Sequence, residues 1–286
     1  MDSEKIEEGI VSLIRKAETD LPIDVIDALR KAAKIEVGVA KVQMETILKN
    51  IDLAKESNRP MCQDTGIQTF FVTIGTAYPY ISELKEWITN GVKRATKEIP
   101  LRPNTVNPLT NENHKDNTGD HIPYITWEFT QSENVTITAL PKGGGSENMS
   151  KLGMLKPGVG IDGVKDFVVD EMIKAGGNPC PPTVVGVGIG GGADLSLKLG
   201  KMALLRPVGI HHKDKSIAAI EEELIKRINE SGIGPMGLGG KTTVLDVHVS
   251  TAHRHPASLP VGISVQCWAD RRAQMVLYPD RSWEVK

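Results

Sequence analysis

The segment TVVGVGIGGGAD, residues 183–194, indicates how this chain folds. Its first part, TVVGVGI, is a short apolar run typical of a buried strand, and Gly190, Gly191 and Gly192 then end that strand. The apolar periodicity that continues through Leu204 predicts a helix directly after the glycines. A buried strand that leads through a tight turn into a helix favours a mixed α/β (α+β) fold.

The same segment contains the pattern G-x-G-x-x-G at residues 186–191, which binds dinucleotides when it joins a strand to a helix. The acidic residue expected about 20 positions later is missing, because that region reads RPVGIHHKDK. A second glycine-rich run, GPMGLGGKTT, resembles a phosphate loop, but Pro235 stands where that loop requires glycine. We therefore interpret residues 186–191 as a tight turn rather than a nucleotide site.

Helices and further strands are predicted on both sides of this segment. Apolar residues at helical spacing predict helices within the first sixty residues and at residues 82–98 and 162–175, the last with Asp162 as its N-cap. Strands are predicted at residues 68–74, 124–130, 134–140, 242–250 and 260–268. We expect residues 124–130 and 134–140 to pair with each other. The expected architecture is a helical N-terminal segment followed by mixed sheets covered by helices, in a single domain over residues 1–286.

The composition excludes several classes of partner. The net charge is −2 and hydrophobic residues make up 40% of the chain, so no bulk charge attracts nucleic acid or an acidic membrane. No apolar run is long enough to span a bilayer, and the acidic start MDSEKIEEG does not resemble a secretion signal. We therefore expect a cytoplasmic protein that binds neither nucleic acid nor membrane.

The three cysteines, Cys62, Cys180 and Cys267, each lie at a predicted turn or strand end. An odd number of cysteines without a secretion signal argues against disulfides, and the lack of a CxxC pair argues against a zinc ribbon. Prolines in PMCQDTG and NPCPPT stiffen the backbone beside two of them. Three thiolates suit an iron–sulfur cluster with one open iron, or a zinc site completed by a histidine, and spacing alone does not decide between these sites.

Six motifs, taken in order, resemble the class I fumarate hydratase family, and most closely the alpha subunit of its two-subunit form. They are CQDTG, LRPN, PKGGGSEN, NPCPP, GIGGGAD and HRHPASLPVGISVQCWADRR, in a match that runs from near Ile10 to Arg272. The L-tartrate dehydratase alpha subunit is closely similar. The resemblance implies a fold of the iron–sulfur hydro-lyase N-terminal-domain type and a hydro-lyase that interconverts fumarate and (S)-malate. Conversion of tartrate to oxaloacetate is the near alternative.

The resemblance also implies roles for individual residues. Cys62, Cys180 and Cys267 correspond to the family's ligands of a [4Fe–4S] cluster, in which one iron has no protein ligand and acts as a Lewis acid. The expected catalytic residues are Asp64 and His255. The expected substrate-binding residues are Gln63, Arg102, Lys142, Gly143, Gly144 and Gly145. Judged from the residues alone, Asp64 also fits an Asx turn, Arg102 a solvated loop, and the glycines a flexible turn.

A partner chain is expected as well. In single-chain relatives a C-terminal domain supplies a threonine base and further arginine and lysine contacts, and no stretch here resembles that domain. We therefore expect a beta subunit to supply the base and to close the site on a small dicarboxylate, in an α₂β₂ assembly. Two hypotheses from other classes remain, a non-catalytic zinc-binding scaffold and a nucleotide-dependent dehydrogenase.

Overall fold

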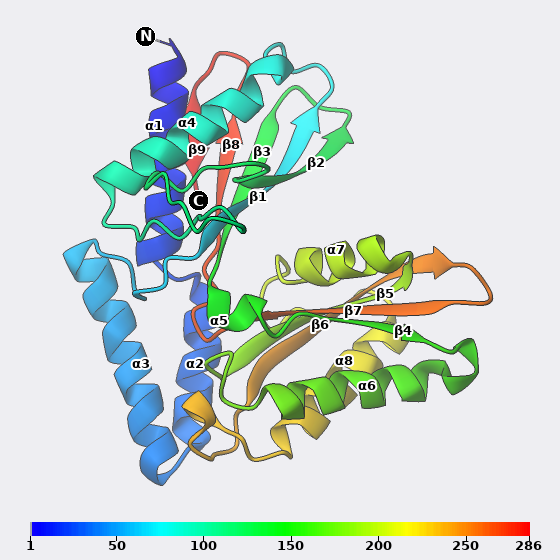
Figure 1. The fold of residues 1–286 in the computed structure, drawn as a ribbon. Coiled ribbons are helices and arrows are strands. Elements are labelled where there is room, and N and C mark those ends of the chain that lie inside the picture. Colours follow the sequence, from blue (N-terminus) through cyan, green and yellow to red (C-terminus); the bar gives the residue numbers. More distant parts are fainter. Residues whose placement is uncertain (1) are drawn as a thin grey trace. The chain divides into compact units, whose positions relative to one another are not determined.

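The computed structural model describes residues 2–286, which form two compact units (Figure 1). Unit 1 contains residues 2–22, 50–143 and 271–286, and unit 2 contains residues 23–49 and 144–270. Each unit has its own sheet and its own hydrophobic core, so each is described by itself. The expectation of one domain over residues 1–286 stays a prediction.

The sheet of unit 1 has the strand order β2-β1-β3-β8-β9. Its strands are β1 (Ile67–Gly75), β2 (Tyr124–Thr130), β3 (Val135–Lys142), β8 (Ala273–Leu277) and β9 (Trp283–Val285). Strand β2 runs parallel to β1, and β3 runs antiparallel to it. The predicted pairing of residues 124–130 with residues 134–140 is therefore wrong, because β1 lies between these two strands. Backbone hydrogen bonds at the end of β1 join it to both neighbouring strands. Gly75 N donates to Asn134 O, just before β3, at 2.9 Å, and Thr76 N donates to Thr130 O of β2 at 2.9 Å.

Helices α1 (Asp2–Thr19) and α4 (Leu84–Glu98) form the core of unit 1 together with its sheet. The predicted apolar face of α1 is buried, with Ile10 and Ile14 inaccessible to solvent. Gly91 of α4 allows close packing against α1, because a Cβ atom at Gly91 would lie 2.5 Å from the Ile10 Cβ atom. The short helix η1 (Ile81–Glu83) precedes α4.

The sheet of unit 2 has the strand order β4-β7-β5-β6. Its strands are β4 (Lys151–Leu155), β5 (Thr183–Gly191), β6 (Val244–Arg254) and β7 (Leu259–Gln266). Only β5 and β6 are parallel, and the other two pairs are antiparallel. Helix α7 (Ala193–Ala203) covers one face, and α6 (Gly160–Ala175) and α8 (Lys215–Asn229) cover the other (Figure 1).

The glycines of residues 186–191 serve this packing. Side chains at Gly186 and Gly188 would overlap the backbone of α7 at Gly200 and Ser196, so the absence of Cβ atoms lets the helix lie directly on β5. The predicted strand, turn and helix are confirmed, as is the mixed α/β fold class. Asp162 is not an N-cap, because α6 begins at Gly160 and places Asp162 in its first turn.

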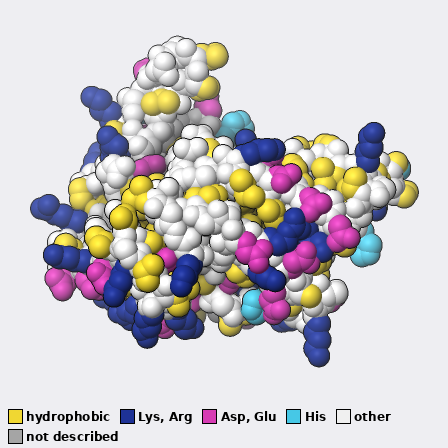
Figure 2. Space-filling view, turned by 90° about the horizontal axis from the view of Figure 1, so that it is seen from below, with side chains coloured by type: hydrophobic (Ala, Val, Ile, Leu, Met, Phe, Trp, Pro, Cys, Tyr) yellow, Lys and Arg dark blue, Asp and Glu magenta, His cyan; other side chains and the backbone are white. Residues whose placement is uncertain are grey.

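The remaining helices are α2 (Ile23–Ile35), α3 (Gly38–Ser57), α5 (Gly144–Glu147), η2 (Pro157–Val159) and η3 (Pro235–Gly237). Unit 2 contains α2 and the first part of α3, whose last residues, 50–57, belong to unit 1. Among residues 2–286, no helix combines the length and the apolar character needed to cross a membrane. Side-chain types on one face of the protein are shown in Figure 2, where charged and hydrophobic groups are interspersed.

Candidate functional site

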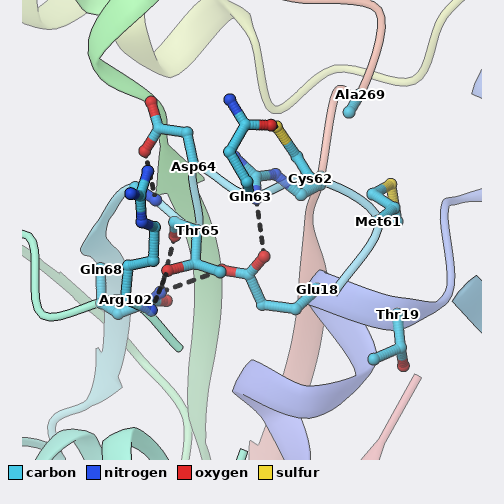
Figure 3. A network of polar contacts seen from close by, with 12 residues as sticks. Glu18, Thr19, Met61, Cys62, Gln63, Asp64, Thr65, Gln68, Arg102 and Ala269 are labelled. Atoms are coloured by element: carbon cyan, nitrogen blue, oxygen red, sulfur yellow. Dashed lines mark hydrogen bonds and ion pairs between the residues drawn. The ribbon is translucent and has the colours of Figure 1, made fainter. Parts of the chain in front are cut away.

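Cys62, Gln63 and Asp64 lie on the segment between α3 and β1 (Figure 3). The Cys62 side chain is half-buried, and its Sγ atom lies 3.4 Å from the Gln63 Oε1 atom. The Asp64 Oδ1 atom accepts a hydrogen bond from Gly66 N at 3.0 Å, which is the geometry of an Asx turn. It also lies 3.4 Å from the Asn104 Nδ2 atom. These contacts orient the carboxylate that the sequence singled out.

A buried glutamate supports this segment from below. Glu18, near the end of α1, is 0% exposed and forms a 2.6 Å ion pair with Arg271, which is 1% exposed. The Gln68 Nε2 atom donates to the second Glu18 oxygen at 3.1 Å. Burial raises the pKa of Glu18, Arg271 and Gln68 oppose that rise, and the charge of Asp64 adds to it. Glu18 is therefore electrostatically coupled to Asp64.

The end of β3 lies against the same segment. Lys142 is buried and pairs with Ile67 across the β1–β3 ladder. Gly66 has a φ of +69°, and a Cβ atom there would lie 2.6 Å from the Lys142 carbonyl carbon. A Cβ atom at Gly143 would lie 3.1 Å from the Asp64 Oδ2 atom. Glycine at both positions therefore allows the end of β3 to lie against Asp64.

Arg102 begins the long polar connection between α4 and β2. Its backbone N–H donates to the Thr65 hydroxyl at 3.0 Å, while its side chain is exposed. The buried Asn117 orders this connection, because its Nδ2 atom donates to Arg102 O at 3.0 Å and its Oδ1 atom accepts from Asn104 N at 2.7 Å. The predicted loop is thus held by side-chain amides, and it fixes the Arg102 backbone beside Thr65.

Unit 2 contains the other two cysteines, at neighbouring strand ends. Cys180 precedes β5 and Cys267 follows β7, and these strands pair as far as Val184 and Gln266. Trp268 N donates to Cys180 O at 3.1 Å, and Cys180 N donates to Gly177 O at 3.1 Å. Cys180 has a φ of +54°, an unusual value for a residue with a side chain. Backbone hydrogen bonds therefore hold these two cysteines close together.

Gly144 and Gly145 start the short helix α5, and their backbone is exposed. His255 lies in the turn that joins β6 to β7, where its side chain is exposed and its Nδ1 atom accepts from Ala257 N at 3.1 Å. This turn and Cys267 are at opposite ends of β7, and a strand of that length spans roughly 25 Å. Within unit 2 the structure therefore does not bring His255 next to Cys180 and Cys267.

Unit 1 brings together Cys62, Gln63, Asp64, Lys142 and Gly143, with the Arg102 backbone beside them. Sequence reasoning missed four residues of this neighbourhood, namely Glu18, Thr65, Asn104 and Arg271. The position of Glu18 on the otherwise apolar stripe of Ile10 and Ile14 was the available signal, since a charge at such a position is buried with a partner.

The chemistry of the sulfur donors fits an iron–sulfur cluster better than a hard cation. Cys62, Cys180 and Cys267 all carry thiols rather than disulfides, and all three are half-buried. Thiolates are soft ligands that select iron–sulfur clusters, zinc or copper. Among residues 2–286, no three or more His, Cys, Asp or Glu side chains form a group that could hold a metal ion by themselves.

Comparison with known proteins gives one family over nearly the whole chain. A family model described as fumarate hydratase (Fumerase) matches residues 7–276. A Methanocaldococcus jannaschii protein named "Putative L(+)-tartrate dehydratase subunit alpha" is 52% identical over 274 residues, covering 94% of this chain and 96% of that protein. The L(+)-tartrate dehydratase subunit alpha of Escherichia coli K12 is 34% identical over 282 residues, covering 98% of this chain and 93% of that protein.

Proposed function

The chain belongs to the fumarate hydratase family, and from that premise we propose that it is the alpha subunit of a [4Fe–4S]-dependent hydro-lyase. The proposed reaction is the reversible hydration of fumarate to (S)-malate. The observation that carries the proposal is the family match over residues 7–276, which includes all three cysteines and the Cys62–Asp64 segment. L(+)-tartrate is the second candidate substrate, because the relatives at 52% and 34% identity are named as L(+)-tartrate dehydratase alpha subunits, the first of them as putative.

In this proposal Cys62, Cys180 and Cys267 hold the cluster as thiolates. When bound, the cluster supplies one iron without a protein ligand, which acts as a Lewis acid toward the hydroxyl group that leaves. Substrate binding and proton handling are proposed to be carried out by side chains and backbone groups of the protein. Three thiols are the donor set that such a cluster requires from the protein.

The Cys62–Asp64 segment and Arg102 are proposed to bind the dicarboxylate. The Arg102 side chain is exposed while its backbone is fixed by Thr65, so a guanidinium is available to form paired hydrogen bonds with a carboxylate. Gln63 is exposed and can donate from its amide. Gly143, Gly144, Gly145 and Lys142 are further proposed substrate contacts, and of these Gly144 and Gly145 are exposed.

Asp64 is the proposed proton-handling residue of this chain, and the role expected for His255 stays a prediction, because its turn lies at the opposite end of β7 from Cys267. Gly66 N and Asn104 orient the Asp64 carboxylate, so it can hold the hydroxyl of a base supplied by another chain. We propose that this base comes from a beta subunit and that the assembly is α₂β₂. The names of the two relatives, each a subunit alpha, support a partner of this kind. A cytoplasmic location is also proposed.

The test is anaerobic turnover by the chain co-produced with its beta subunit, with (S)-malate and L(+)-tartrate assayed in parallel. We expect dehydration of malate to exceed that of tartrate in kcat/KM, and no turnover by the alpha chain alone. Preference for tartrate would make the second candidate correct. Turnover of neither substrate by a complex that contains iron and sulfide would refute the hydro-lyase assignment. A colourless, zinc-containing chain would favour the scaffold hypothesis instead.

A further inference from the structure

The Glu18–Arg271 pair is an unusual way to support a loop. Both side chains are almost fully buried, and burying an ion pair costs several kcal/mol of desolvation that well-packed apolar residues would avoid. The rest of the α1 stripe is apolar, including Ile6, Ile10 and Ile14. The pair is therefore poorly explained as a source of stability, and its contacts indicate a different role.

Glu18 contacts one end of the Cys62 segment directly and the other end through Gln68. Its backbone carbonyl accepts from Met61 N at 3.0 Å, directly before Cys62. Its side chain accepts from the Gln68 Nε2 atom at 3.1 Å, and the same nitrogen lies 3.3 Å from Thr65 O, directly after Asp64. The Glu18 backbone thus holds Met61, and the Glu18 side chain supports Thr65 through Gln68.

Arg271 extends this support to the other side of Asp64. Its guanidinium forms a 2.6 Å ion pair with the Glu18 Oε2 atom, while Gln68 binds the Oε1 atom. A Cβ atom at Gly143 would lie 3.6 Å from the Arg271 Nη2 atom and 3.1 Å from the Asp64 Oδ2 atom, so arginine and aspartate flank the same glycine. Figure 3 shows Glu18 beneath the segment that carries Cys62, Gln63 and Asp64, with Gln68 to one side.

We propose that Glu18 and Arg271 are positioning residues: their buried ion pair orients Gln68 and, through it, Thr65, and so sets where Cys62 and Asp64 present their side chains. We call this arrangement the clamp. The roles of Cys62 and Asp64 at the site rest on the proposed function, whereas the clamp itself does not. An ion pair with fixed hydrogen-bond directions specifies one loop geometry, whereas an apolar contact at the same place tolerates sliding.

The first test measures the loop in the full-length, cluster-free chain under anaerobic conditions. Alkylation of each cysteine is followed by mass spectrometry in Glu18→Gln, Arg271→Met and the wild type. We expect Cys62 to react about tenfold faster in both variants, equivalent to about 1.4 kcal/mol of lost local protection. Cys180 and Cys267 belong to unit 2, are internal controls, and should change less than about twofold.

The matched control is Glu98→Gln, which removes a glutamate from an exposed pair with Arg94 and should leave all three rates unchanged. Two milder variants cover the case in which the buried substitutions prevent folding. Arg271→Lys keeps the charge and should restore most of the protection, and Gln68→Met cuts the link to Thr65 without unpairing a charge and should accelerate Cys62 partially. An unchanged Cys62 rate in the folded variants would overturn the proposal.

A second readout separates a positioning role from general weakening. In the assembled complex, Gln68→Met should lower kcat for the substrate that turns over while iron content and melting temperature stay at the wild-type values, and Arg271→Lys should keep most of the wild-type kcat. A loss of iron and melting temperature together, with an unaltered Cys62 rate in the cluster-free chain, would show an ordinary stabilising contact. Alkylation needs neither cluster nor substrate, so it tests the clamp independently of the proposed reaction. Failure of the reaction would not refute the clamp, and failure of the clamp would not refute the reaction.

Discussion

Units 1 and 2 hold their cysteines by different physical means. In unit 1 one backbone hydrogen bond, from Met61 N to Glu18 O, supports the Cys62 segment, and the side chains of Glu18, Arg271 and Gln68 supply the other support. In unit 2 Cys180 and Cys267 are supported by backbone groups at the ends of β5 and β7, through Trp268 N and Gly177 O. Side-chain support depends on the identity of a few residues, whereas backbone support depends on the sheet beneath it. The two units should therefore respond to different substitutions.

The packing of the two units differs in the same sense. Helix α1 of unit 1 packs through large apolar side chains and places a charge at its buried end. Helix α7 of unit 2 packs directly on the backbone of β5, because Gly186 and Gly188 of that strand have no side chains. Loss of a charge partner should thus be the most costly change in unit 1, and addition of a methyl group the most costly change in unit 2.

The largest effect is expected from Arg271→Met. Removing one partner of a buried ion pair leaves the Glu18 carboxylate buried without its cation, which costs about 3–5 kcal/mol. Amide hydrogen exchange should accelerate in β1 and β3 much more than in β5. The control Arg94→Met removes partly exposed pairs with Glu98 and Glu7 and should cost about 1 kcal/mol. Equal costs for the two variants would contradict the special role of the buried pair.

The next largest effect is expected from Gly188→Ala. The added Cβ atom would overlap Ser196 O and lie 2.8 Å from Gly200 N, and overpacking of this kind costs about 1–3 kcal/mol. Exchange should accelerate in β5 and α7, while β1 and β3 keep their protection. Gly158→Ala, where the new methyl group meets no atom within 4 Å, is the matched control in the same unit. If both variants unfold at the same denaturant concentration, the close packing of α7 is not energetically important.

The smallest effect concerns acid stability in unit 2. Burial pushes the pKa of Asp246 up, but His248 and the N–H groups of Gly209 and Val247 outweigh it and leave the pKa below its ordinary value of 3.8. A lowered carboxylate pKa adds stability that is complete above pH 3.8 and is lost as the pH falls through the folded-state value. Asp246→Asn should cost about 1 kcal/mol near neutral pH.

The pH dependence supplies the sharper measurement for this aspartate. Unfolding free energy should fall more steeply below pH 3.8 in the wild type than in Asp246→Asn, because the variant has no carboxylate to protonate. Parallel curves below that pH would show that Asp246 does not carry this part of the acid dependence. Hydrogen exchange of the β1 and β3 amides of unit 1, measured in the same sample, is the reference for the effect of Asp246→Asn on unit 2.

Local features of the fold were predictable, and long-range ones were not. Ile10 and Ile14 were expected on a buried helical face, and they are inaccessible to solvent. The strand before Gly190 and the helix after it were also correct. The pairing of β2 with β3 was wrong because nothing local indicates that β1, more than fifty residues earlier in the chain, enters between them. Apolar patterning sets which residues are buried, but it does not set which strands are neighbours.

The candidate site shows the same limit. The cysteines and the Asp64 turn were found because rare residue types and short-range turn chemistry are visible in the sequence. Glu18 and Arg271 were missed because their contact joins the two ends of the chain. The location of His255 at the far end of β7 from Cys267 likewise depends on strand direction, which motif spacing does not reveal.

The central proposal is that Cys62, Cys180 and Cys267 all hold the proposed iron–sulfur cluster. The most direct measurement is iron and sulfide content after anaerobic reconstitution of the wild type, Cys62→Ser, Cys180→Ser and Cys267→Ser, each with the beta subunit. Met61→Leu, beside Cys62, is the control. We predict about four iron and about four sulfide per alpha chain in the wild type and the control, and loss of stable cluster in each serine variant. Wild-type iron and sulfide in any one serine variant would contradict the account.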